Sequence, residues 1–111
     1  MNERNSYSIL MVNLPFAGHT NPTLGLARVL TDMGHRVTYI HSPAWREAVE
    51  NTGAHFVPYD DYPLFPRPFQ DRMRCWRAAY RTVLRIGAGY DCLLYEMLFV
   101  SGKALADRLG I

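Results

Sequence analysis

His19 is the residue of this chain best suited to proton chemistry. It lies in the segment Leu14–Pro22, which follows a buried apolar run and precedes the first expected helix. In an open α/β sheet such a segment lies at the carboxyl edge of the strands, where ligands bind. A neutral imidazole, with an ordinary pKa of about 6.5, accepts protons near neutral pH. His19 is therefore a candidate general base, and a structural or solvent-exposed histidine is the alternative interpretation.

A carboxylate follows the last expected strand in the same way. Glu96 comes directly after the apolar run Cys92–Tyr95. A carboxylate bound to the second ring nitrogen of a histidine fixes the tautomer and stabilises the imidazolium that forms during proton transfer. General base catalysis of this kind contributes about 10²–10⁴-fold in rate. Whether His19 and Glu96 can meet depends on the order of the strands.

Four short runs of apolar and β-branched residues predict strands. They are the ranges Tyr7–Asn13, Val37–Ile40, His55–Tyr59 and Cys92–Tyr95. The near-continuous apolar character of the first run is typical of a parallel strand that is covered on both faces.

Helical patterns fill the intervals between these runs. Asn21 can cap the first helix, with Pro22 at its first position and Gly34 as its end. Ser42 and the proline after it repeat this start for a helix that ends near residue 53. A third helix is expected over 70–86, ended by Gly87 and Gly89, and a last one starts a few residues after Glu96. The apolar residues at helical spacing are Leu26, Val29, Leu30 and Met33, then Met73, Trp76, Tyr80 and Val83, then Leu98, Leu105 and Leu109.

Alternating strands and helices predict an α/β fold, a Rossmann-like doubly wound parallel sheet with right-handed crossovers. In the commonest such sheet the spatial order is 3-2-1-4, so the first and fourth strands are neighbours. This order would bring His19 and Glu96 toward the same crevice.

The composition describes one globular domain. The chain has 111 residues, 49% of them hydrophobic, and a formal net charge of +2, which gives no reason to expect a nucleic-acid partner. Its amino-terminal apolar run is too short for a secretory or membrane-spanning segment, so we expect a cytoplasmic protein without a transmembrane helix. Cys75 and Cys92 lack the spacing of metal ligands or of a disulfide framework, and we expect free thiols.

Other residues of chemically active types have structural explanations. His35, His41 and His55 lie at strand starts and ends without partners at metal-ligand spacing, so we expect packing or surface roles and no metal. Asp60 and Asp61 lie beside a proline-rich segment, where turn formation explains them better than acid and base chemistry.

Three stretches carry a resemblance to a known family. They are the run Ile9–Leu24 with its Gly-His-x-Asn-Pro segment, the run Gly34–Tyr39, and the run Tyr90–Glu96. Together with Ala54–Tyr59 and Leu105–Gly110 they resemble the amino-terminal part of the UDP-glycosyltransferases of the GT-B fold (glycosyltransferase family 1), closest to the macrolide glycosyltransferase type. The resemblance covers nearly the whole chain.

The resemblance implies an activity and assigns acceptor binding and donor binding to two different domains. Residues 1–111 would be a partial, Rossmann-like acceptor-binding domain, and the carboxy-terminal domain that binds the nucleotide sugar would be absent. His19 would deprotonate a hydroxyl of a small-molecule acceptor, which attacks the sugar of a UDP-sugar with inversion. Glu96 would take the position of the partner carboxylate, which is commonly aspartate in the family. No G-x-G-x-x-G or P-loop motif offers a diphosphate site, so the chain is expected to be inactive without a complementing donor-binding domain and to hold no cofactor of its own.

Aromatic residues are the candidates for contact with the acceptor. Phe16 lies beside His19, and Phe65 and Phe69 lie in the proline-rich segment. Together with Trp76 and Tyr80, Phe65 and Phe69 could line an apolar pocket, although apolar side chains at this spacing more often belong to the core.

A helix rich in arginine supports a different hypothesis. Five arginines recur between residues 72 and 85, namely Arg72, Arg74, Arg77, Arg81 and Arg85. The chain could be a non-catalytic binding module that engages an anionic partner or a membrane surface through this helix. The alternative is an ordinary solvated helix face.

Overall fold

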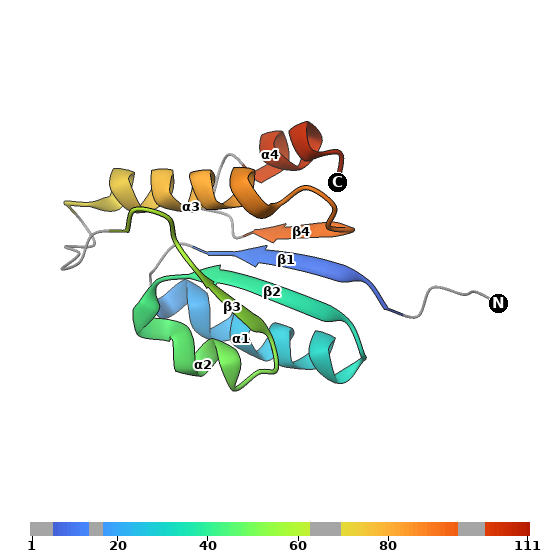
Figure 1. The fold of residues 1–111 in the computed structure, drawn as a ribbon. Helices are drawn as coiled ribbons and strands as arrows, with labels where there is room; N and C mark the ends of the chain where they lie inside the picture. The colour runs from blue at the N-terminus through green and yellow to red at the C-terminus, as the bar shows by residue number, and fades with distance from the viewer. Residues whose placement is uncertain (1–5, 14–16, 63–69, 96–101) are drawn as a thin grey trace.

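A parallel sheet forms the centre of the molecule. The computed structural model describes residues 6–13, 17–62, 70–95 and 102–111, without the side chains of residues 17–20, 72 and 102–105. Its strands are β1 (Ser8–Val12), β2 (Arg36–His41), β3 (His55–Pro58) and β4 (Cys92–Tyr95). They pair in parallel in the order β3-β2-β1-β4 (Figure 1). The predicted α/β fold and strand order are confirmed.

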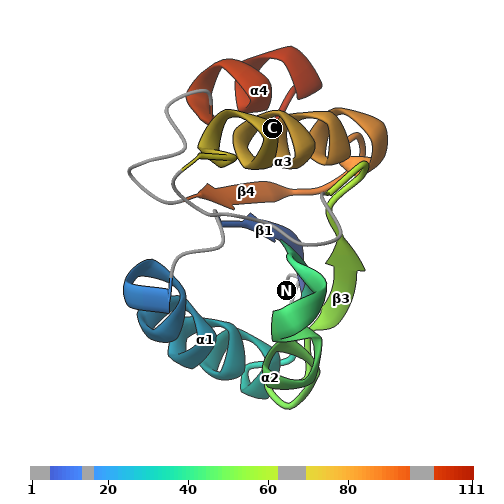
Figure 2. The same cartoon turned by 90° about the vertical axis from the view of Figure 1, so that its left-hand side faces the viewer.

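Helices cover both faces of the sheet. They are α1 (Ala17–Asp32), the 3₁₀ turn η1 (Pro43–Trp45) with α2 (Arg46–Glu50), α3 (Arg72–Ile86) and α4 (Gly102–Leu109). Figure 2 shows α1 and α2 on one face of the sheet and α3 and α4 on the other. None of the helices in the described part of the chain is both long and apolar enough to cross a membrane.

The alternation of side chains along β1 divides the core in two. Leu10 and Val12 pack with α3, whereas Ile9 and Met11 pack with the α1 and α2 side. All four side chains are buried, as expected for a strand covered on both faces. The expectation drawn from the first apolar run is therefore confirmed.

The start of α1 differs from our prediction. The helix begins at Ala17 and contains Pro22, so Asn21 is not its cap and Pro22 is not its first residue. A proline within a helix lacks one hydrogen bond, the bond to the carbonyl four residues earlier, and this single loss does not end the helix here. His19 therefore lies in the first turn of α1 rather than in a loop.

The end of α1 follows the prediction. Gly34 has a φ of +94°, a conformation that glycine adopts without strain. Its amide donates to the carbonyl of Thr31 at 3.0 Å, and the amide of His35 donates to the carbonyl of Leu30 at 3.1 Å. This pair of bonds is the Schellman arrangement that ends many helices.

The apolar spacing read in the sequence matches the buried helix faces only in part, since Trp76, Tyr80 and Val83 belong to the core as expected. On α1 the apolar residues Leu26 and Val29 are exposed, as is Met33 directly after the helix, while the small Ala27 is buried. On α3 Met73 is 55% exposed, and the buried stripe includes Cys75 and three further residues, Ala78, Ala79 and Val83. Small side chains let a helix lie close to the sheet, and this close packing decides which face is covered.

Candidate active site at the carboxyl edge of the sheet

The ends of β1 and β4 lie side by side. Val12 pairs with Tyr95, so the last residues of the two strands are level. His19 lies in the first turn of α1, the element that follows β1, and residue 96 directly follows β4. The two segments therefore start from adjacent points of one sheet edge, as the predicted topology requires. The side chains of His19 and Glu96 lie outside the described residues.

A buried polar network lies just beyond β1. The side-chain amide of Asn13 donates to Oγ1 of Thr23 at 2.9 Å, and that oxygen lies 2.5 Å from the hydroxyl of Tyr39. Asn13 and Tyr39 are buried in the core of the molecule. The network therefore joins the end of β1, the second turn of α1 and the middle of β2.

Tyr59, which directly follows β3, extends this network across β2. Its hydroxyl donates to the backbone carbonyl of Asn13. Its ring packs against the rings of His41 and Tyr62, with centroids 6.0 and 5.1 Å away. Backbone carbonyls at strand ends have no partner within their own ladder, so this bond satisfies a group that burial would otherwise penalise.

His41, the last residue of β2, is fully buried beside the network. Its ring lies among the rings of Tyr39, Trp45 and Tyr59. Burial lowers the pKa of His41 to about 4, because the interior disfavours the charged imidazolium. The backbone amide of Ser42 donates to its Nδ1 at 2.7 Å, and that nitrogen is thus the acceptor of the neutral ring. His41 therefore packs as a neutral side chain, in agreement with the structural role that we expected.

The network holds the segment that carries His19 at both of its ends. Asn13 precedes His19 by six residues and Thr23 follows it by four, and the bond between them closes this stretch. The amide, hydroxyl and phenol groups of Asn13, Thr23, Tyr39 and Tyr59 carry no charge near neutral pH. This arrangement can fix the backbone around His19, but it supplies no second base or acid.

For the other residues predicted to form the site, the structure either gives no position or places them in the core. Phe16, Phe65, Phe69 and Glu96 lie outside the described residues, so their roles stay predictions. Trp76 and Tyr80 are half-buried on α3, pack against the core and stack on each other with centroids 5.3 Å apart. These two aromatic residues are core components, which is the alternative that we had left open for them.

The other histidines, the paired aspartates and the cysteines lie at several separate places in the fold. Asp60 and Asp61 lie in a turn after β3, and Asp61 has a φ of 56°. His35 accepts a hydrogen bond from the amide of Tyr7, and His55 is exposed. Cys75 and Cys92 are free thiols. Among the residues that the structure describes, no group of histidine, cysteine and acidic side chains could hold a metal ion.

Sequence reasoning missed the polar network. The signal that could have found it is the recurrence of a polar residue where each strand ends, with Asn13 after β1, His41 at the end of β2 and Tyr59 after β3. Parallel strands bring their carboxyl ends to one edge, so polar residues at three successive ends lie close together.

The fold and the strand ends together define a doubly wound α/β protein whose candidate site lies at the carboxyl edge of its sheet. No protein-family model matches the sequence. The oleandomycin glycosyltransferase of Streptomyces antibioticus is 38% identical over 119 residues, which cover 93% of this chain and 27% of the relative. The NDP-glycosyltransferase YjiC of Bacillus subtilis is 27% identical over 118 residues, 95% of this chain and 30% of the relative.

A solved structure shows the same arrangement. The crystal structure of CalG4, the calicheamicin glycosyltransferase, superposes with a TM-score of 0.72 at 25% identity, over 96% of this chain and 31% of that one. The chain matches glycosyltransferases of the GT-B fold over more than nine-tenths of its length, as its sequence motifs indicated. It spans about three-tenths of the length of these relatives.

Proposed function

We propose that this chain supplies the acceptor-binding part of a glycosyltransferase that transfers a sugar to a hydroxyl of a small molecule. The observation that carries the proposal is the pairing of Val12 with Tyr95, from which the segments of His19 and Glu96 start at one sheet edge. The similarity to glycosyltransferases over more than nine-tenths of the chain supports the same reaction.

The proposed chemistry is a single displacement. His19 takes the proton of the acceptor hydroxyl, and the hydroxyl oxygen attacks the anomeric carbon of the nucleotide sugar as the bond to the diphosphate breaks. Attack opposite the leaving group inverts the anomeric configuration. Glu96 orients the imidazole of His19 and stabilises its charged form. The network of Asn13 and Thr23 holds the backbone that carries His19.

The sequence contains no recognisable phosphate-binding motif for the sugar donor. Neither a glycine-rich phosphate loop nor a P-loop occurs in the sequence. A nucleotide sugar, which we take to be a UDP-sugar, would therefore bind to a separate donor-binding domain that complements this chain. The sugar and the acceptor are then joined only where the two parts meet.

A chimaera tests the proposal. The chain replaces the matching part of the oleandomycin glycosyltransferase, and UDP release is measured with UDP-glucose and oleandomycin as the first acceptor. His19→Ala should lower turnover at least about a hundredfold, the usual contribution of a general base. His55→Ala is the matched control, because His55 is exposed on β3. Full transfer by a folded His19→Ala chimaera would show that another group is the base.

A further inference from the structure

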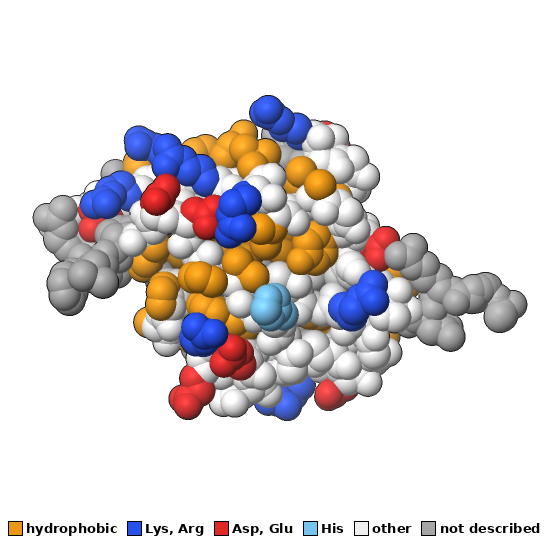
Figure 3. Space-filling view, viewed as in Figure 1, with side chains coloured by type: hydrophobic (Ala, Val, Ile, Leu, Met, Phe, Trp, Pro, Cys, Tyr) orange, Lys and Arg blue, Asp and Glu red, His pale blue; other side chains and the backbone are white. Residues whose placement is uncertain are grey.

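The exposed face of α3 holds a hollow lined by arginines. Arg74, Arg77 and Arg81 line it together with Ala78 and Asp61, around a volume of about 170 Å³. Figure 3 shows basic side chains gathered over α3 with acidic ones beside them. The side chain of Ala78 is short, so the space between the longer neighbours stays open.

The acidic residues nearby do not match this charge. Asp60 binds Arg85 through two bonds of 2.7 and 2.9 Å, and Asp61 lies 3.4 Å from Arg81. Within the described residues, neither Arg74 nor Arg77 forms an ion pair. The residues that line the hollow therefore carry three guanidinium groups and one carboxylate.

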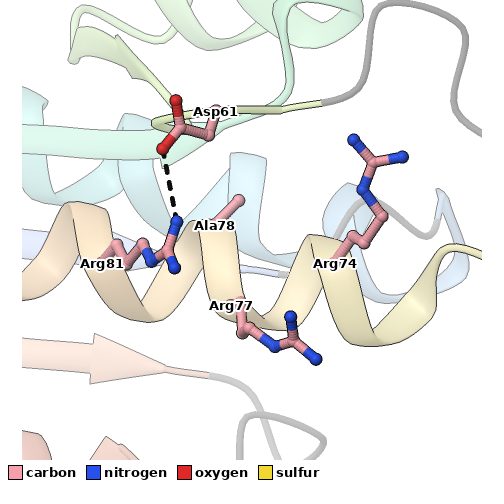
Figure 4. A pocket seen from close by; sticks show the side chains of 5 residues that line it. All are labelled: Asp61, Arg74, Arg77, Ala78 and Arg81. Atoms are coloured by element: carbon pink, nitrogen blue, oxygen red, sulfur yellow. Dashed lines mark hydrogen bonds and ion pairs between the residues drawn. The ribbon is translucent and has the colours of Figure 1, made fainter.

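The arginine side chains repel one another and so destabilise the helix, and a bound anion would remove this repulsion. Arg77 and Arg81 are four residues apart on one helix, and like charges at this spacing destabilise it. Figure 4 shows Arg74 and Arg81 extending toward the side where Asp61 lies, with Arg77 at the opposite edge of the helix in this view. Exposed side chains change rotamer within nanoseconds, so Arg77 can turn toward a ligand that the other two hold.

We propose that this hollow binds the phosphate group of a dissolved small molecule. A guanidinium donates paired hydrogen bonds that match the oxygens of phosphate, and the charge of each partner strengthens them. The concave shape favours a compact solute over a flat lipid surface. The site lies on α3, apart from the network at Asn13, and it does not depend on the proposed transfer reaction.

The test measures inorganic phosphate binding to the whole chain. The side-chain Nε–H resonances of arginine are followed by NMR during a phosphate titration, with sodium chloride added to keep the ionic strength constant. Resonances of Arg74, Arg77 and Arg81 should shift together and saturate. The double variant Arg74→Gln/Arg77→Gln should bind about tenfold more weakly or worse, because two charged donors are lost.

A second double variant is the matched control. Arg46→Gln/Arg108→Gln removes the same charge from α2 and α4, where both arginines are exposed, and should leave binding unchanged. Equal shifts at Arg46 and Arg108 in the unaltered chain would overturn the proposal, as would undiminished binding by Arg74→Gln/Arg77→Gln. Vesicles of phosphatidylcholine with phosphatidic acid separate the two sources of phosphate, and binding to these vesicles without binding of dissolved phosphate would also overturn it.

Discussion

The two polar regions of this molecule are built on opposite principles. At the carboxyl edge of the sheet, Asn13, Tyr39 and His41 are buried, uncharged and hydrogen-bonded. On α3, Arg74 and Arg77 are exposed and charged, and neither forms an ion pair with a described residue. Buried polar groups must be satisfied within the protein, whereas exposed charges remain available to a ligand. The first region is suited to positioning, and the second to binding.

The largest expected effect concerns His41 and pH. Its pKa is lowered to about 4 in the folded chain, against about 6.5 when unfolded. The unfolded state therefore takes up a proton first as the pH falls, and the free energy of unfolding decreases between about pH 6.5 and pH 4. The loss should reach about 3 kcal/mol at low pH. Urea unfolding of the chain and of His41→Asn over this range measures the difference.

Comparison of the original chain with His41→Asn isolates the contribution of His41 to the pH dependence of stability. The carboxylates titrate in both, so their effect cancels in the difference between them. His55→Asn is the control for the type of substitution, since His55 is exposed. A parallel pH dependence in the chain and in His41→Asn would contradict a buried, neutral histidine.

A smaller effect is expected from Thr23, which joins α1 to the polar network. Thr23→Val keeps the shape of the side chain and removes the hydroxyl that contacts Asn13 and Tyr39. The expected loss is about 1–3 kcal/mol, because two buried polar groups lose a partner. Chemical denaturation at neutral pH measures it. Thr23→Ser retains the hydroxyl and should be less damaging, and a valine variant as stable as the original chain would show that the network does not hold α1.

The sequence predicted the sheet better than it predicted these two regions. The strand order is the commonest one for a doubly wound sheet, as predicted. β4 has the predicted bounds Cys92–Tyr95, although only Leu93 among its residues is buried. The network was missed because it joins β1, α1, β2 and the end of β3, and no local pattern records such contacts. The start of α1 was misplaced because the Asn21-Pro22 pair satisfies the local preferences of a helix start, although the helix begins earlier.

The arginines of α3 were visible in the sequence, but the hollow was not. Their recurrence indicated a basic face, which is equally typical of a solvated helix. Only the structure shows that Asp60 and Asp61 turn back toward Arg85 and Arg81, whereas Arg74 and Arg77 form no ion pair with a described residue. The pattern of charged residues in a sequence indicates the sign of the charge on a surface. The tertiary structure decides which of these charges are neutralised by ion pairs.

The smallest effect on stability is expected from a substitution of Asp61. This substitution should change phosphate binding at the hollow while leaving the stability of the chain almost unchanged. Asp61 and Arg81 are 78% and 61% exposed, and an ion pair so open to solvent contributes at most about 1 kcal/mol. The backbone of Asp61 has a φ of 56°, which an asparagine in its place would tolerate, since asparagine adopts this conformation more readily than most residues. Asp61→Asn should therefore unfold almost as the original chain does.

The same change removes the one carboxylate of the hollow, so phosphate should bind about two- to fivefold more tightly, less so at high salt. Unchanged or weaker phosphate binding by this variant would show that the hollow does not act through its charge.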